Sequence, residues 1–247
     1  MKVALIGATG FVGSAVLKEL LQRGHEVVAL VRDPARLAAQ PHLHAVQADV
    51  LDAAAVQRAV AGADAVVSAY NAGWGNPDIY EDFMRGSRAI VAGTKAAGVK
   101  RYLVVGGAGS LYIAPGRQLV DTPEFPAAIK PGASAARDAL NDLQKEQGLD
   151  WTMLSPPIAL HLGDHGERTG QYRTGKDEPL MQADGQPGNP DAADRFTPTV
   201  YLYDNYPGGI GLSEPLWRRQ AELVQRAREL VAACDCAAGC PACVGPV

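Results

Sequence analysis

The sequence predicts an α/β fold, a doubly wound parallel sheet with a small Cys-rich appendage at its C-terminal end. Over residues 1–110, short β-branched runs alternate with longer segments of helical periodicity. Strands and helices that alternate at this spacing form a parallel sheet covered on both faces. Right-handed crossovers then give the strand order 3-2-1-4-5. All four cysteines fall within residues 234–243, which sets the appendage apart from the sheet.

Each element of the first half follows from its local pattern. Short apolar runs predict strands over residues 3–6, 26–31, 43–47, 64–68 and 101–105. Helices are predicted between them, over residues 12–23, 53–61 and 78–97. A further short helix is expected to open at Asp33-Pro34.

The second half is less regular. Residues 106–132 are rich in Gly and Pro and are expected to form a loop. A helix over residues 133–146 and a strand over residues 151–154 follow. A last strand is predicted over residues 199–203, and Ser213 suits the N-cap of a final helix with an apolar stripe.

A change in composition marks the domain boundary. Pro, Gly, Asp and Asn dominate residues 184–198. We therefore predict a first domain over residues 1–186, a junction over residues 187–198 and a C-terminal segment over residues 199–247.

Three glycines with the spacing G-x-x-G-x-x-G connect the first strand to the first helix. Gly7 permits a tight turn, Gly10 lets the backbone approach a pyrophosphate, and Gly13 lets the helix pack close to the sheet. The unpaired amides and the positive end of the helix then face the phosphates. Because the strands and the helix occupy the required positions, the pattern predicts a Rossmann-type dinucleotide site. Its turn residues are Gly7, Thr9, Gly10, Phe11, Val12 and Gly13.

The end of the second strand indicates which dinucleotide binds. NAD-binding proteins usually place Asp or Glu there, whereas Arg accommodates a 2′-phosphate. This sequence has Arg32, with Arg36 one turn further on. Asp33 precedes Pro34 and suits an N-cap, so it already has a structural role. We therefore favour NADP(H), with NAD as the alternative; solvated arginines without a ligand are the other interpretation.

Two further segments follow strands at the edge where such ligands lie. Asp49 and Val50, after the third strand, are expected to touch the adenine. Ser68, Ala69 and Tyr70, after the fourth, are expected to run beside the pyrophosphate and the nicotinamide ribose. Ordinary loop is the alternative for both segments.

The composition is that of an ordinary globular protein. Apolar residues make up 47% of the chain and charged residues 20%, with a formal net charge of −4. No apolar run reaches the roughly 18–20 residues that a bilayer span requires, and glycines interrupt the apolar N-terminus before a signal peptide could form. The 233 residues before the Cys cluster contain no cysteine, so we expect a cytoplasmic protein. A small-molecule substrate is expected, without membrane or nucleic-acid binding, and homo-oligomerisation stays open.

Residues 2–37, Gln47-Ala48-Asp49-Val50 and residues 102–110 together resemble the atypical short-chain dehydrogenase/reductase superfamily. The similarity is to its small NAD(P)H-binding proteins of the NmrA-like and flavin/biliverdin reductase-like types. The segments Val104 to Ser110 and Asp150 to Pro156 strengthen the resemblance, which extends over residues 1 to about 186. It implies a Rossmann fold and reduction by a nicotinamide cofactor.

Members of this superfamily with full chemistry carry a Tyr-x-x-x-Lys pair at the start of the helix after the fifth strand. The Tyr supplies a proton, and the Lys lowers its pKa and holds the ribose. Lys130 and Ser134 stand at the matching positions, so we expect the standard proton relay to be absent. Ser110, at the end of the fifth strand, is the candidate catalytic residue for polarising a substrate carbonyl, with a purely structural role as the alternative.

The chain departs from the reductases near residue 185. Residues 202–212, the helix after them and the Cys cluster resemble the zinc-binding C-terminal region of certain bacterial DEAD/DEAH-type helicases. The Gly-Lys-Ser/Thr motif of a helicase motor is missing. Independently, four thiolates within ten residues suit a tetrahedral Zn²⁺ site. The candidate ligands are Cys234, Cys236, Cys240 and Cys243, and a reduced tail without metal is the alternative.

Two unrelated signatures on one chain indicate a natural fusion, a chimera or an engineered sequence. Residues 199–232 either pack onto the sheet edge or leave an edge that promotes association. The first functional hypothesis is an NADP(H)-dependent reductase that transfers hydride to a small carbonyl, flavin or quinone-like acceptor. The second is a non-catalytic NAD(P)H sensor, and the third makes the zinc-bearing tail an interaction module.

Overall fold

The computed structural model describes residues 1–158, 160, 173–179 and 199–203. The chain divides into two units, Met1–Asn205 and Tyr206–Val247, and every described element belongs to the first. The predicted helix after Ser213 lies outside the described residues. Among the helices that are described, none has the length and apolar composition that crossing a membrane requires.

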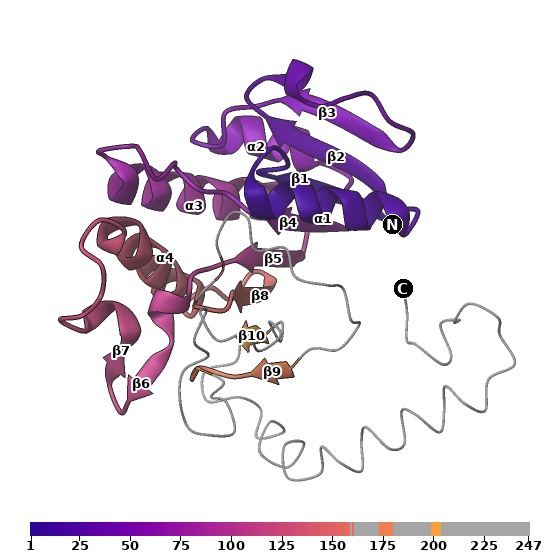
Figure 1. The fold of residues 1–247 in the computed structure, drawn as a ribbon. Coiled ribbons are helices and arrows are strands. Elements are labelled where there is room, and N and C mark those ends of the chain that lie inside the picture. The colour runs from indigo at the N-terminus through magenta and orange to yellow at the C-terminus, as the bar shows by residue number, and fades with distance from the viewer. Residues whose placement is uncertain (159, 161–172, 180–198, 204–247) are drawn as a thin grey trace, which may run out of the picture. The chain divides into compact units, whose positions relative to one another are not determined.

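A single main sheet runs through the first unit (Figure 1). Its parallel strands are, in spatial order, β3 (Leu43–Gln47), β2 (Glu26–Val31), β1 (Lys2–Ile6), β4 (Ala65–Ser68), β5 (Arg101–Val105) and β8 (Asp150–Ser155). This arrangement confirms the predicted doubly wound order 3-2-1-4-5. The connections reverse direction between β1 and β4, so a ligand-binding crevice is expected at the carboxyl ends of these two strands.

Two more strands continue the sheet beyond β8. β10 (Thr199–Tyr203) pairs antiparallel with β8, and its residue Tyr201 lies opposite Ser155. β9 (Arg173–Gly175) pairs parallel with β10. β10 coincides with the strand predicted over residues 199–203 and joins the sheet edge, whereas β9 was not predicted because three residues carry too little periodicity.

Alternate strand positions face two different helical layers. The described α-helices are α1 (Phe11–Gln22), α2 (Ala53–Val60), α3 (Ile79–Ala96) and α4 (Lys130–Leu143). Leu5 of β1 packs with Leu17 of α1 on one face. Its neighbour Ile6 belongs to the core on the other face, together with Ile90 of α3 and Leu140 of α4. Burial on both faces explains why the strands read as nearly continuous apolar runs.

The helix predicted over residues 133–146 begins earlier in the structure. α4 starts at Lys130, three residues before the prediction, with Pro131 in its first turn. Proline is tolerated there because the first amides of a helix have no acceptor within it. The end was also overestimated, since α4 stops at Leu143.

The segment predicted as a plain loop, residues 106–132, contains ordered structure. Two short helices, η2 (Ala108–Ser110) and η3 (Leu119–Asp121), flank a hairpin of β6 (Tyr112–Ala114) and β7 (Arg117–Gln118). Pro115-Gly116 makes the tight turn, and Gly116 has a φ of +72°. The hairpin was missed because its strands are too short to show alternation.

Candidate functional site

The turn from Gly7 to Gly13 joins β1 to α1 at the predicted ligand edge. Gly7 has a φ of +83°, and a Cβ atom there would lie 2.5 Å from the carbonyl oxygen of Ala69. A Cβ atom on Gly13 would lie 1.9 Å from the carbonyl oxygen of Gly7. Both positions therefore require glycine for close packing inside the protein itself.

Gly10 differs from the other two glycines because it is exposed and less crowded. It is exposed, and the only neighbour of an added Cβ would be the Gly7 carbonyl oxygen at 3.3 Å. Gly10 is also the N-cap of α1, with no side chain to cap the helix and no acidic residue in the first turn. The first amides of a helix lack intrahelical acceptors. The uncapped helix start and the exposed backbone of Gly10 suit the diphosphate group of a dinucleotide.

The loop after β2 carries the two predicted arginines. Arg32 and Arg36 are both exposed, and the ion pairs of the described residues involve neither. The Asp33 carboxylate accepts a hydrogen bond of 3.0 Å from the amide of Ala35 and caps the short helix η1 (Pro34–Arg36). Asp33 therefore has the structural role predicted for it.

Asp49 and Val50 follow β3, as predicted. Asp49 is exposed, and its Oδ1 accepts a hydrogen bond of 2.9 Å from the amide of Leu51. Val50 is half-buried and packs against the core on the side of α2. The adenine contact of this pair stays a prediction.

The segment after β4 lies against the glycine turn through its backbone. The Ala69 amide donates to the Ile6 carbonyl at 2.9 Å, and the Ala69 carbonyl faces Gly7. Ser68 is buried, and its hydroxyl oxygen accepts the Tyr70 amide at 3.4 Å and interacts with the Tyr102 hydroxyl. The Ser68 side chain therefore interacts within the protein interior, and the ligand contacts of residues 68–70 stay a prediction.

The environment of Tyr70 differs from that of the tyrosine in a Tyr–Lys relay. Burial, reinforced by the nearby Asp82 carboxylate, raises the pKa of Tyr70 to about 12. Its hydroxyl donates to the Asp82 carbonyl oxygen at 2.9 Å, and its ring stacks on Phe83. In the Tyr–Lys relay the tyrosine pKa is lowered instead.

The residues at the matching Tyr and Lys positions lie in the first turns of α4. Lys130 is exposed, Ser134 is half-buried, and α4 contains no tyrosine. One Tyr with Lys four residues later does occur elsewhere, at Tyr172 and Lys176. Lys176 follows β9 rather than lying on α4, and Tyr172 lies outside the described residues.

Ser110 lies in η2, just after β5. Its side chain is only 1% exposed. The hydroxyl donates to the Gly107 carbonyl at 2.9 Å and lies 3.5 Å from the Ser155 hydroxyl. This geometry makes Ser110 a residue that holds the glycine-rich turn, and direct contact with a substrate stays a prediction.

A group of exposed apolar side chains was not recognised from the sequence. They share a position after the carboxyl end of a parallel strand. They are Trp74 after β4, Tyr112, Ile113 and Ile129 after β5, and Ile158 after β8. We call these five residues the apolar rim. The sequence did contain a signal for these residues, because large apolar side chains stand out within otherwise polar, Gly- and Pro-rich segments.

The four cysteines lie outside the described residues, so only their chemistry can be assessed. Four thiolates match the donor set of a tetrahedral zinc site. Within the part of the chain that the structure describes, His, Cys, Asp and Glu form no group that could hold a metal ion.

The C-terminal part matches a known zinc-binding domain. The family described as the MrfA Zn-binding domain covers residues 181–244, which include all four cysteines. The ATP-dependent helicase YprA of Bacillus subtilis, itself uncharacterised, is 46% identical over 54 residues, which are 22% of this chain and 7% of the helicase. The likeness therefore concerns a short segment of that much longer protein.

The sheet-forming part matches nucleotide-binding proteins. The uncharacterised protein YwnB of Bacillus subtilis is 40% identical over 187 residues, which are 75% of this chain and 84% of YwnB. A candidate epimerase from Bacteroides thetaiotaomicron has a TM-score of 0.68 at 39% identity, covering 83% of this chain and 98% of that one. A candidate NADH-flavin reductase from Streptococcus pneumoniae has a TM-score of 0.60 at 28% identity, covering 83% and 99%. Because the family described as NAD(P)H-binding matches residues 7–186, this chain belongs to that family.

Proposed function

We propose that the protein is an NADP(H)-dependent reductase of the atypical short-chain type. The observation that carries the proposal is the open side of Gly10 at the uncapped start of α1. Arg32 and Arg36, exposed and without carboxylate partners among the described residues, support a phosphorylated ribose over a plain one. NADPH, when bound, supplies the hydride.

The chain's own residues have binding and positioning roles in this proposal. The amides at the start of α1 hold the diphosphate, and the Ala69 backbone lies beside it. Asp49 contacts the adenosine half. Ser110 fixes the turn at Gly107, close to where the nicotinamide ring is expected from the strand order. The protein thus orients the cofactor and excludes water, which brings a large part of the rate enhancement in reactions of this kind.

The apolar rim supports a planar, largely apolar hydride acceptor. Its side chains belong to the connections that follow β4, β5 and β8, and such connections leave a parallel sheet at the end where the nicotinamide would lie. A flavin or quinone-like ring fits this surface better than a small polar carbonyl. Two electrons and one proton pass to the acceptor as hydride, a second proton comes from water, and NADPH becomes NADP⁺.

Gly10→Ala tests the cofactor site with only a small adjustment of the turn. The added methyl would lie 3.3 Å from the Gly7 carbonyl oxygen, a tight contact that a shift of a few tenths of an ångström relieves, and it would occupy the open side of the turn. Gly75→Ala is the matched control, because Gly75 lies in open space and its φ is not positive. We expect Gly10→Ala to weaken NADPH binding at least about tenfold in calorimetry, since phosphate-binding amides are worth roughly 1.5–3 kcal/mol each. Equal affinity in Gly10→Ala, Gly75→Ala and the unmodified protein would overturn the site.

A non-catalytic nucleotide sensor is the second candidate function. It is favoured by the absence of tyrosine from α4 and by the raised pKa of Tyr70. A sensor would bind NADPH yet oxidise it no faster than buffer with flavins, quinones and small carbonyls. Saturable NADPH oxidation with any of these acceptors, lost in Gly10→Ala, would exclude the sensor.

A further inference from the structure

A cavity of about 800 Å³ opens between α1 and the loop that follows β2. Its α1 wall includes Ser14 and Lys18, which are four residues apart and therefore share one helix face. The loop contributes Arg36 and His42, and Thr9 of the glycine turn is also among the lining residues. The cavity thus shares a residue with the predicted diphosphate site and extends along α1.

The charge of this cavity is one-sided. Lys18 from α1 and Arg36 from the loop after β2 both carry permanent positive charges, and no Asp or Glu is among the lining residues. Two cations in one cavity without a carboxylate favour the binding of an anion.

The nearest acidic side chains have other partners. The Glu19 carboxylate, next to Lys18 in the sequence, pairs with Arg23 at 2.7 Å one turn further along α1. The Asp33 carboxylate accepts the Ala35 amide. In the described part of the chain, Lys18 and Arg36 take part in no ion pair, so both are available to a ligand.

We propose that this cavity receives the ribose phosphate of NADP(H), and that Lys18 is a specificity-determining residue that acts opposite Arg36. The inference rests on the proposed function, because it requires the cofactor to lie on the glycine turn. Thr9 provides the connection, since it belongs both to that turn and to the cavity lining. A dianionic phosphate that enters from the turn would lie between the two cations, whereas the free ribose hydroxyl of NAD(H) would leave both unpaired.

Sequence reasoning identified Arg36 but missed Lys18. The arginines follow the second strand, where a known rule assigns ribose recognition. Lys18 is in the third turn of α1 and belongs to no motif. Only the packing of the loop against α1 brings it to the same cavity as Arg36.

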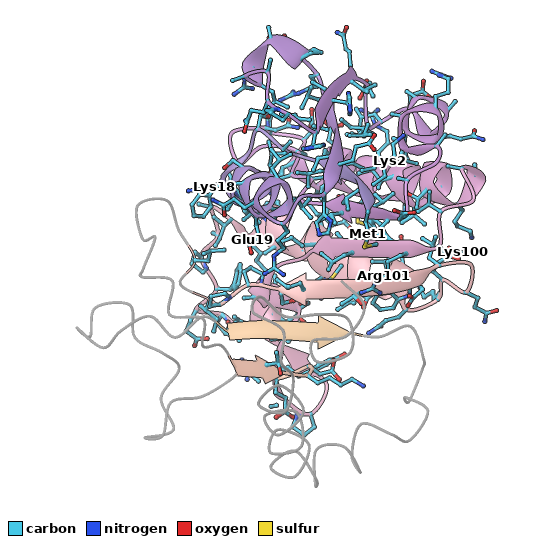
Figure 2. All side chains as sticks on the ribbon, turned by 90° about the vertical axis from the view of Figure 1, so that its right-hand side faces the viewer. Met1, Lys2, Lys18, Glu19, Lys100 and Arg101 are labelled. Carbon is cyan, nitrogen blue, oxygen red and sulfur yellow. The ribbon has the colours of Figure 1, made fainter. Side chains whose placement is uncertain are left out.

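The test compares Lys18→Gln with Lys100→Gln. Lys100, just before β5, is also exposed, and Figure 2 shows Lys18 and Lys100 on opposite sides of the view. Calorimetry would measure the Kd values of NADPH, NADH, adenosine 2′,5′-bisphosphate and AMP. We expect Lys18→Gln to weaken NADPH and the bisphosphate about 10- to 100-fold, the range for a charged hydrogen bond. NADH and AMP should change less than about twofold, Lys18→Arg should restore most of the affinity, and Lys100→Gln should behave like the unmodified protein.

The outcomes separate this inference from the function on which it rests. If the unmodified protein binds NADPH but Lys18→Gln leaves its affinity unchanged, Lys18 has no role and only the present inference fails. Equal weakening of NADPH and NADH would also overturn it, since the effect would then not depend on the ribose phosphate. If the unmodified protein binds neither nucleotide, the proposed function fails as well.

Discussion

The Tyr80 hydroxyl donates a hydrogen bond of 2.7 Å to the Asp138 carboxylate and so joins the first turn of α3 to the middle of α4. Arg137 and Asn141 add their own hydrogen bonds to the other oxygen of this carboxylate, at 2.6 and 3.2 Å. Burial alone would raise the pKa of Asp138, but the hydrogen bonds from Tyr80 and Arg137 outweigh it and lower that pKa below its ordinary value of 3.8.

This arrangement predicts that Asp138 stabilises the fold in a pH-dependent manner. A carboxyl whose pKa is lowered by folding contributes stability above its ordinary pKa and loses it as the pH falls through the folded-state pKa. We expect Asp138→Asn to lower the free energy of unfolding by about 1–3 kcal/mol at pH 7. Urea unfolding at a series of pH values should show this difference shrinking below about pH 4.

Asp150→Asn is the control for that measurement. The Asp150 side chain is 67% exposed and lies 3.4 Å from Arg101, so its removal should change stability by less than about 1 kcal/mol. A difference for Asp138→Asn that stays constant from pH 7 to the acid limit would contradict the assigned role of the carboxylate.

Gly13→Ala is expected to disrupt the packing of α1 against the glycine turn. Because the new methyl would lie 1.9 Å from the Gly7 carbonyl oxygen, α1 must move away from β1. Overpacking of this kind costs about 1–3 kcal/mol or more. Thermal unfolding should show a lower Tm, and NADPH affinity should fall together with it. An unchanged Tm would mean that the contact relaxes freely.

Ser110→Ala distinguishes a positioning role from a catalytic one. Loss of the hydrogen bond to Gly107 should lower stability by about 1 kcal/mol. We expect kcat to fall less than about tenfold and KM for the acceptor to rise. A general acid–base residue contributes roughly 10²- to 10⁴-fold, so a fall in kcat of that size would support a catalytic role for Ser110.

Trp74→Ala tests the apolar rim. Trp74 is exposed, and its ring lies near Gly132 at the start of α4. Removing the ring should raise KM for a flavin or quinone acceptor about tenfold, because stacking and burial of an aromatic side chain contribute on the order of 1–2 kcal/mol. The Kd of NADPH should stay the same. A parallel loss of NADPH binding would place Trp74 at the cofactor instead.

The cysteine cluster predicts one zinc ion per chain, bound by Cys234, Cys236, Cys240 and Cys243. Native mass spectrometry should record this stoichiometry, and Cys240→Ser should lower it sharply because a structural zinc site needs all four ligands. NADPH affinity should change less than about twofold, since the glycine turn lies in the other unit. Full metal retention in a variant that lacks all four cysteines would contradict the assignment.

Much of the fold could be predicted because its signals are local. The alternation of buried strands with helices up to Val105 correctly predicts the sheet order, and the conformations of Gly7 and Gly13 follow from their spacing. Asp33 was also predictable, because Asp before Pro is a common helix start.

What could not be predicted depends on contacts between distant segments. Lys18 lines the same cavity as Arg36 only because the loop that follows β2 lies beside α1. The sequence left open whether Ser110 has a catalytic or a structural role, and only the structure shows its hydroxyl beside Ser155. β9 and the hairpin of β6 and β7 are too short to leave a periodic signal, so tertiary pairing alone defines them.

The strand β10 has a practical consequence for any attempt to take the protein apart. Its residues fall within the stretch that matches the zinc-binding family, yet their backbone pairs with β8 of the nucleotide-binding sheet on one side and with β9 on the other. A truncation at residue 198 would remove β10 and leave the amides and carbonyls of β8 able to pair with another molecule. A truncation after Asn205 keeps β10 in the sheet. The boundary between the two units of this chain therefore lies inside the stretch that matches the zinc-binding family.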